Sequence, residues 1–279
     1  MIVVFVEKGI IMTGKTIRSS AGKNIDVKEI YSVLRTKFIS QNIKYYREID
    51  STNEEAKRNA IECDGTLFIA DVQTNGRGRL GRMWDSAAYD GIWMSLLIKP
   101  ETKPENIPLI TLVAGVAVCR VIKGAKIKWP NDIVIGSRKL CGILTEKTKS
   151  ADGSDVVICG IGINVNTEAF SDELSDKATS LYIETGNIFK REKIIAEIMN
   201  EFENLYTAFL ETGFGTIREY YCRECVTLNK EVKIIHNNTE LVGTAIDVDE
   251  TGQLIVRTEN EIMAVNSGEV SVRGMYGYI

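Results

Sequence analysis

A short run of alternating arginines and glycines, residues 76–84, is the segment of this chain whose composition most directly indicates chemistry. It reads Gly-Arg-Gly-Arg-Leu-Gly-Arg-Met-Trp and follows an apolar, strand-like stretch over 66–72. Arginine carries a permanent charge and a planar set of donors that suits carboxylates and phosphates, and glycine lets backbone N–H groups approach an anion closely. Because its three arginines repel one another, the run predicts a loop that holds an anionic ligand.

Three other interpretations of this run are weaker. Its spacing fits the G-x-G-x-x-G of dinucleotide-binding folds, but that pattern requires a helix after the glycines, and here a loop over 85–91 and a strand-like stretch over 92–98 follow. The net charge of −4 disfavours general binding of DNA or RNA, since no broad basic stripe surrounds the run. A solvated basic turn would leave the repulsion between the arginines uncompensated.

The composition is that of an ordinary globular chain. Its 279 residues, 44% hydrophobic and 26% charged, suggest one large domain with a small one, or two domains. No apolar run approaches the roughly 20 residues that span a bilayer, and the apolar start lacks the basic segment of a signal peptide, so we expect no membrane association and a cytoplasmic location. Cys222 and Cys225 form a C-x-x-C, but the only histidine is His236. A zinc site needs further ligands, so we expect structural thiols and assign no metal ligands.

Hydrophobic periodicity predicts a mixed α+β domain followed by a small all-β one. Helices are expected over 26–38, from 51 onward, and over 104–122, 191–209 and 216–222. Strands are expected over 43–49, 66–73, 92–99, 133–135, 139–146 and 156–165. Five short strands after Leu228 predict a closed barrel. The predicted organisation is a leader with one helix over 1–42, a catalytic domain over 43–228 and a barrel over 229–279.

Polar motifs lie at the ends of several predicted strands. They are Ser51-Thr52-Asn53, Gln73 with the arginine run, Lys128-Trp129-Pro130-Asn131-Asp132, Lys139-Leu140-Cys141-Gly142-Ile143-Leu144 and Gly160-Ile161-Gly162-Ile163-Asn164-Val165-Asn166. Ser51 with Glu54 and Thr52 with Glu55 both fit a capping box, so a helix is expected to begin there. In this order the motifs resemble the catalytic domain of biotin–protein ligases, with the signatures G-R-G-R-x-G-R-x-W, K-W-P-N-D and K-x-x-G-I-L all present.

The resemblance extends from about residue 43 to the C-terminus and implies both a fold and a reaction. The implied fold is a mixed sheet packed with helices, like that of class II synthetases and biotin/lipoate ligases, followed by an SH3-like barrel. Biotin and ATP would give biotinyl-AMP and pyrophosphate, and a lysine of a biotin carboxyl carrier domain would then take the biotinyl group. A Mg²⁺ ion held mainly by phosphate oxygens would accompany ATP. The resemblance also leaves a homodimer open.

Residue roles follow from the same resemblance. The residues implied to bind biotin are Ser51, Thr52, Asn53, Gln73, Gly76, Arg77, Gly78, Arg79, Lys139, Gly142 and Gly160. Those implied on the ATP side are Arg79, Arg82, Trp84, Asn131, Asp132, Lys139 and Asn164. Arg77, Arg79 and Lys139 would stabilise the two anions that react. Asp132 would either deprotonate the acceptor lysine or lie near the metal, whereas Trp129 is expected in the core and Lys128 in solvent.

Three rival functions remain. A lipoate–protein or octanoate–protein transferase resembles this family in fold, but it carries a different arginine and glycine loop. A biotin-sensing DNA-binding regulator is disfavoured by charge and because the residues before 43 are too few for a complete three-helix DNA-binding module. The type of ligase without that module is therefore expected, with a leader that is the tail of a truncated DNA-binding arm as the alternative. A nucleotide-binding protein without catalysis is disfavoured because Lys139 and all three arginines of the run are present.

Overall fold

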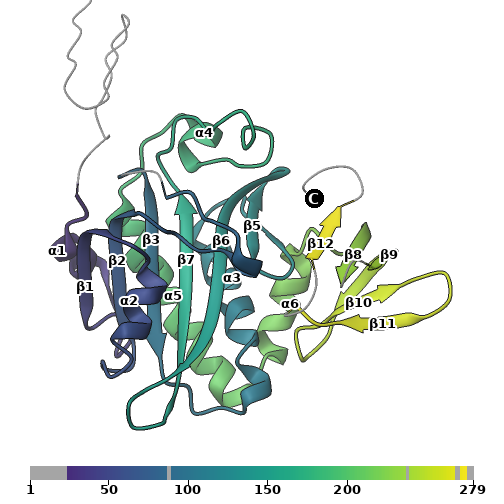
Figure 1. Cartoon of the computed structure of the whole chain (residues 1–279), viewed down its shortest axis with the longest axis horizontal. Coiled ribbons are helices and arrows are strands. Elements are labelled where there is room, and N and C mark those ends of the chain that lie inside the picture. Colours follow the sequence, from purple (N-terminus) through teal and green to yellow (C-terminus); the bar gives the residue numbers. More distant parts are fainter. Residues whose placement is uncertain (1–23, 87–88, 237–238, 268–270, 275–279) are drawn as a thin grey trace, which may run out of the picture.

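A seven-stranded mixed sheet forms the centre of the protein (Figure 1). This computed structural model describes residues 24–86, 89–236, 239–267 and 271–274, so most of the predicted leader lies outside the described residues. The strands are β1 (Ile43–Ile49), β2 (Thr66–Gln73), β3 (Gly91–Ile98), β4 (Lys126–Lys128), β5 (Asp132–Ile135), β6 (Arg138–Lys149) and β7 (Asp155–Asn164). Their order is β1-β2-β3-β7-β6-β5-β4, and only β1 and β2 pair in parallel. This sheet confirms the predicted α+β class.

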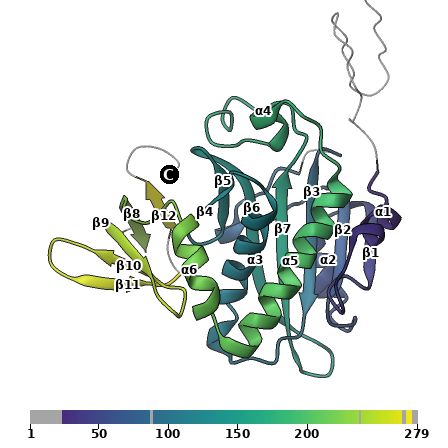
Figure 2. The same ribbon diagram turned by 180° about the vertical axis from the view of Figure 1, so that it is seen from behind.

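Helices cover both faces of the sheet. α3 (Leu109–Val121) and α5 (Arg191–Thr212) lie on one face, where they pack with Leu67 and Ile69 (Figure 2). α2 (Thr52–Arg58) lies on the other face, over Phe68. Because successive strand residues point to opposite faces, β2 supplies both layers. The shorter helices are α1 (Val27–Val33), α4 (Leu181–Thr185) and α6 (Gly215–Glu224), with single turns of 3₁₀ helix at Arg79–Gly81 and Pro104–Asn106.

The apolar stretch Pro104–Val121 is by length and composition able to cross a membrane, which corrects the expectation that no run approaches that length. It combines a 3₁₀ turn with α3, and Pro108 separates the two. Of this stretch, 56% is buried, and α3 packs against α5 and β6. These contacts are those of the core helix of a globular protein.

The helix predicted over 26–38 ends at Val33, so its second half was predicted wrongly. Side chains of α5 capture the backbone that follows. The N–H of Arg35 donates to Asn200 Oδ1 at 2.6 Å, and the N–H groups of residues 37–39 donate to the Glu203 carboxylate at 2.7, 2.9 and 2.9 Å. These N–H groups would donate to backbone carbonyls if the helix continued. Because they donate to side chains of α5 instead, residues 34–39 are irregular and pack against α5.

The C-terminal residues form the predicted small all-β unit. Its strands are β8 (Glu231–His236), β9 (Thr239–Val248), β10 (Leu254–Arg257), β11 (Ile262–Val265) and β12 (Ser271–Gly274). They pair in the antiparallel order β11-β10-β9-β8-β12, and within the described residues no pairing joins the edge strands into the fully closed barrel that was predicted. The unit shares one hydrophobic core with α3 and α5, as do Ile25 and Ile39. The domain limits at 42 and 228 therefore stay predictions.

Candidate functional site

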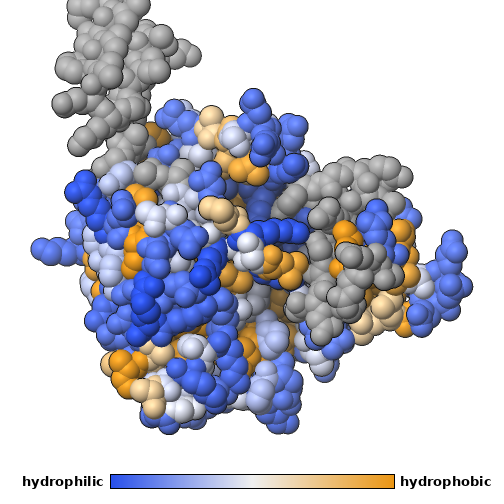
Figure 3. All heavy atoms as spheres, viewed as in Figure 1, coloured by the Kyte–Doolittle hydropathy of each residue, from blue (hydrophilic) through white to orange (hydrophobic). Residues whose placement is uncertain are grey.

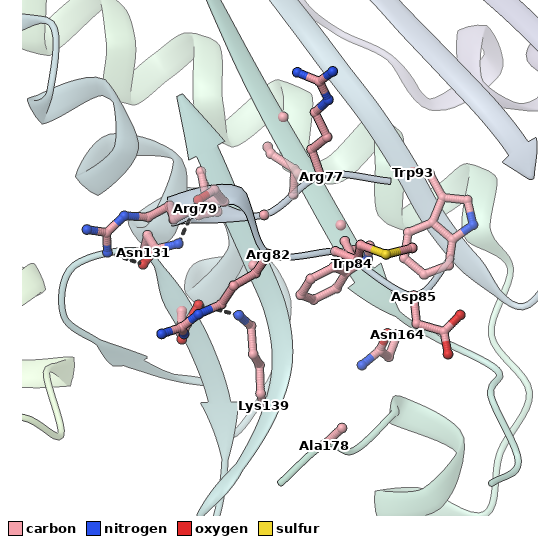
Figure 4. A pocket seen from close by; sticks show the side chains of 18 of the residues that line it. Arg77, Arg79, Arg82, Trp84, Asp85, Trp93, Asn131, Lys139, Asn164 and Ala178 are labelled. Atoms are coloured by element: carbon pink, nitrogen blue, oxygen red, sulfur yellow. Dashed lines mark hydrogen bonds and ion pairs between the residues drawn. The ribbon is translucent and has the colours of Figure 1, made fainter. Parts of the chain in front are cut away.

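A cavity of about 820 Å³ lies between the start of α2, residues 76–84 (the arginine loop) and strands β3, β6 and β7 (Figure 4). Hydrophilic residues predominate over α2 and the middle of this face of the molecule (Figure 3). All but one of the predicted site residues line the cavity. These are Ser51, Thr52, Asn53, Gln73, Arg77, Gly78, Arg79, Arg82, Trp84, Asn131, Asp132, Lys139, Gly142, Gly160 and Asn164.

Gly76 is the exception, contrary to the expectation that it contacts biotin. It is buried at the base of the arginine loop, where its carbonyl accepts from the N–H of Trp84 at 2.9 Å. A Cβ there would lie 2.5 Å from the Trp84 carbonyl oxygen and 2.7 Å from Ser86 Oγ. Glycine is therefore required at this position for the two sides of the loop to approach each other.

The start of α2 and the end of β2 are joined through Gln73. Ser51 is the N-cap, but its side chain makes no cap hydrogen bond, so the predicted capping box with Glu54 is wrong. Instead, Gln73 Oε1 accepts from the N–H of Thr52 at 2.8 Å and from its hydroxyl at 3.0 Å. The amide of Gln73 in turn donates to Ser86 Oγ at 2.9 Å. The backbone N–H at the start of α2 is therefore bound by Gln73, a residue distant in sequence, and not by the side chain of Ser51. This contact fixes the polar end of the cavity.

Asn53 is held by neighbours on three strands. Its amide donates to Glu146 Oε2 at 2.8 Å, and Ser95 Oγ donates to Asn53 Oδ1 at 2.6 Å. A Cβ at Gly160 would lie only 2.1 Å from Asn53 Oδ1. Gly160 was expected to let a ligand approach the backbone. In this structure the Asn53 side chain occupies that space instead.

Trp84 lies flat on a pair of glycines. Gly142 and Gly162 are directly opposite each other in the β6–β7 register, and a Cβ on either would lie 2.7 Å from an indole atom of Trp84. Trp93 packs against the same indole in an edge-to-face arrangement, with ring centroids 6.3 Å apart and ring planes at 71°, and Lys139 Nζ lies 4.9 Å from the centroid of the Trp84 ring. The indole N–H groups of both tryptophans are buried without a hydrogen-bond partner among the described residues. Gly142 therefore admits a side chain of the protein itself.

Two cations meet the K-W-P-N-D motif at the cavity wall. Lys139 Nζ lies 2.6 Å from Asp132 Oδ1. The guanidinium of Arg79 donates to Asn131 Oδ1 at 3.0 Å and to the carbonyl of Ser267 in the C-terminal unit. Burial lowers the pKa of Arg79, although an arginine remains charged in proteins. This part of the cavity is thus cationic, and the C-terminal unit helps to fix it.

Arg77 points away from Lys139 and Asn131 (Figure 4). Its guanidinium instead pairs with Glu54 Oε1 of α2 at 2.8 Å. Cations nevertheless outnumber anions around the cavity. The charged side chains that line it are Arg77, Arg79, Arg82, Lys128, Lys139 and Lys177 against Asp85, Asp132 and Asp176. The cavity is therefore suited to an anion with several charges.

Several lining residues were not predicted. Lys128 is only 7% exposed and lines the cavity, so its prediction as a solvated charge is wrong, while Trp129 is in the core as expected and also reaches the cavity. The segment from Phe170 to Ala178 contributes a further wall. It is placed by a backbone bridge, since the N–H of Lys139 donates to the carbonyl of Lys177 at 2.7 Å. Because this segment is irregular and polar, its sequence has no hydrophobic period that could have placed it at the cavity. Its position depends on the long-range backbone pairing with Lys139.

Among the residues that the structure describes, no group of three or more His, Cys, Asp or Glu side chains is placed to hold a metal ion. All six cysteines are free thiols, with Cys225 buried and Cys222 half-buried.

Comparison with known proteins places the signatures in a family. The model of the Biotin/lipoate A/B protein ligase family matches residues 45–164, and that of the Biotin protein ligase C terminal domain matches 227–273. The bifunctional ligase/repressor BirA of Bacillus spizizenii is 38% identical over 255 residues, which cover 88% of this chain and 78% of that protein. A biotin–acetyl-CoA-carboxylase ligase of Mycobacterium tuberculosis is 28% identical over 244 residues, which cover 81% of this chain and 89% of that protein. Among solved structures, the biotin protein ligase from Aquifex aeolicus in complex with biotin and ATP has a TM-score of 0.76 at 32% identity, over 84% of this chain and 99% of that one.

Proposed function

This chain belongs to the biotin protein ligase family, and we propose that it activates biotin with ATP and transfers the biotinyl group to a carrier lysine. The observation that carries the proposal is the cavity itself. It brings residues of the arginine loop, K-W-P-N-D and K-x-x-G-I-L together with the start of α2 around one space. The acceptor is the biotin carrier domain of a biotin-dependent carboxylase, consistent with the name of the mycobacterial relative.

In the first step a biotin carboxylate oxygen bonds to the α-phosphorus of ATP, and the bond to pyrophosphate breaks. Two anions must approach each other, so fixed cations lower the barrier by electrostatic stabilisation. Arg79 and Lys139 are held by Asn131 and Asp132 in positions suited to this task. A Mg²⁺ ion bound to ATP would neutralise part of the triphosphate charge and would be held mainly by phosphate oxygens and water; the carboxylates nearest to it would be those that line the cavity, Asp85, Asp132 and Asp176.

The two substrates would take different ends of the cavity. We assign the ureido ring of biotin to Thr52 and Gln73, because these side chains already form a fixed chain of hydrogen bonds there. Apolar side chains that line the cavity suit the fused rings and the alkyl chain; they include Trp93, Met94 and Ile161. We assign the ATP side to Arg82, Trp84, Asn131 and Asn164.

In the second step the ε-amine of the carrier lysine bonds to the acyl carbon, and the bond from that carbon to the AMP oxygen breaks. Asp132 is either the base for that amine or a group near the metal. An Asp132→Asn variant separates the two roles, because loss of a base lowers transfer from preformed biotinyl-AMP and spares its formation. Equal loss in both steps would refute the base role and leave Asp132 a role near the metal or in holding Lys139.

The direct test is ATP–pyrophosphate exchange by the purified protein with biotin, with lipoate or with neither acid. Exchange that depends on biotin supports the proposal, and Lys139→Met serves as the inactive control. Exchange that depends on lipoate would mean that the protein is a lipoate ligase of the same fold. Exchange with neither acid would refute the enzymatic assignment. A homodimer, a cytoplasmic location and the lack of membrane or DNA binding remain predictions from the sequence.

A further inference from the structure

A buried ion pair outside the cavity connects the two strands that flank the arginine loop. Asp71 of β2 is fully buried, and Arg191, the first residue of α5, is 5% exposed. Arg191 Nη2 lies 3.1 Å from Asp71 Oδ1, and Arg191 Nη1 donates to the carbonyl of Gly91, the first residue of β3, at 3.0 Å. The chain leaves β2 for the loop two residues after Asp71 and re-enters the sheet at Gly91. One guanidinium therefore contacts both ends of this connection.

We propose that Asp71 and Arg191 are positioning residues, which fix the ends of the connection and so hold Arg77 and Arg79 at the cavity. This proposal rests on the assignment of the arginine loop to the anionic substrates. Neither residue lines the cavity, so both would act through the loop and not on the reacting atoms.

Asp71 has further partners, which make it the centre of a satisfied buried network. The hydroxyl of Tyr45 donates to Asp71 Oδ2, and the N–H of Ile25 donates to Oδ1 at 3.3 Å. Burial and the nearby Asp71 raise the pKa of Tyr45, so this phenol remains a donor at neutral pH. The carbonyl of Asp71 accepts from the N–H of Tyr89 at 3.2 Å, which adds a contact from the returning part of the connection.

The location of Arg191 argues that this pair does more than stabilise the fold. A cation in the first turn of a helix opposes the helix dipole, so α5 gains nothing from an arginine there. A buried ion pair also contributes little net stability compared with apolar residues of similar size. Arg191 contacts β2 and β3 at once because its planar guanidinium has several N–H donors, and a smaller group could not make both contacts.

Tyr45→Phe tests the network with the loss of one oxygen atom, and Tyr46→Phe is its matched control. Tyr46, the next residue of β1, donates to Glu55 of α2 at 3.0 Å and not to Asp71. We expect Tyr45→Phe to release biotinyl-AMP about 10-fold faster, equivalent to about 1.4 kcal/mol, and Tyr46→Phe to release it at the wild-type rate. Without any substrate, we also expect faster trypsin cleavage after the loop arginines in Tyr45→Phe. Wild-type release and cleavage in Tyr45→Phe, or equal changes in Tyr46→Phe, would overturn the proposal.

Arg191→Lys provides the second test, because it keeps the charge beside Asp71 but lacks the second arm that reaches Gly91. We expect at least the 10-fold effect on adenylate release that Tyr45→Phe shows, and again faster loop cleavage. A lower melting temperature with unchanged adenylate release and unchanged cleavage would assign Arg191 a structural role only and refute the proposal. The cleavage assay needs no substrate, so its outcome is independent of the proposed function, which pyrophosphate exchange by the wild type tests separately.

Discussion

Adding one methyl group at Gly162 should displace Trp84 and impair catalysis without unfolding the protein. A Cβ at this position would lie 2.7 Å from the Nε1 atom and 2.8 Å from the Cε2 atom of the indole. Heavy atoms in good contact are about 3.5–4.0 Å apart, so the ring must move by roughly 1 Å. Trp84 belongs to the arginine loop, and the displacement would therefore reach the groups that we assign to ATP.

The expected magnitude follows from this geometry. A misplacement of about 1 Å in a positioned site can cost roughly 100-fold in rate, so we expect Gly162→Ala to lower kcat/KM for ATP by about 10- to 100-fold. The cost to stability should be small. Overpacking costs about 1–3 kcal/mol, and replacing a strand glycine by alanine recovers about 0.5–1 kcal/mol. Trp84 is also half-buried on a loop, where it can yield.

The assay is biotin-dependent pyrophosphate exchange across a range of ATP concentrations, with thermal unfolding measured in parallel. Gly115→Ala is the matched control for a buried glycine, since its Cβ would meet neighbours at 3.7 Å and 3.9 Å, which are ordinary contacts. A second variant tests the cause. Trp84→Phe in the Gly162→Ala background makes room for the methyl group and should recover part of the lost kcat/KM.

Wild-type kinetics in a folded Gly162→Ala protein would refute the idea that the glycine pair determines where Trp84 lies. Equal losses in Gly162→Ala and Gly115→Ala would refute it as well, because the effect would then belong to any buried glycine. If Gly162→Ala lowered kcat/KM for biotin but left kcat/KM for ATP unchanged, the Trp84 indole would contact biotin and not ATP.

Three further perturbations test other parts of the site. Arg79→Gly removes a charge-assisted contact worth about 1.5–3 kcal/mol, so biotinyl-AMP should leave roughly 10- to 100-fold faster, measured as adenylate release and as labelling of a bystander protein. Lys139→Met should lower pyrophosphate exchange at least about 100-fold with a melting temperature close to that of the wild type. Hydrogen bonds from Arg58 hold the pKa of Asp50 at about 2, below its usual 3.8, so its stabilising effect is present above pH 4 and is lost as the pH falls through 2. Because Asp50 is 43% exposed, Asp50→Asn should cost less than about 1 kcal/mol in denaturant unfolding at pH 7, and this cost should decrease as the pH falls through 2.

Elements with a strong period were predictable from the sequence, whereas features set by distant partners were not. The strand that feeds the arginine loop was expected over 66–73 and is found there, because a short continuous apolar run suits a strand whose two faces are both covered by helices. The helix at 26 was expected to be longer. Its sequence continues to favour a helix, but Glu203, over 160 residues away, captures the backbone. Lys128 was predicted in solvent, but it is only 7% exposed on the edge strand β4 and lines the cavity, a placement that depends on tertiary packing and not on local sequence.

The signature motifs located the cavity but did not reveal what each of their glycines does within it. Gly76, Gly142 and Gly160 were all expected at the biotin, because glycine admits close approach. The atoms that approach them in the structure belong to the protein itself: a Trp84 carbonyl, the Trp84 indole and the Asn53 amide. A glycine in such a motif therefore specifies the placement of a neighbouring side chain as readily as it admits a ligand. Because those neighbours in turn shape the wall of the cavity, a methyl group at any of the three glycines should alter substrate binding through the protein and not by direct contact.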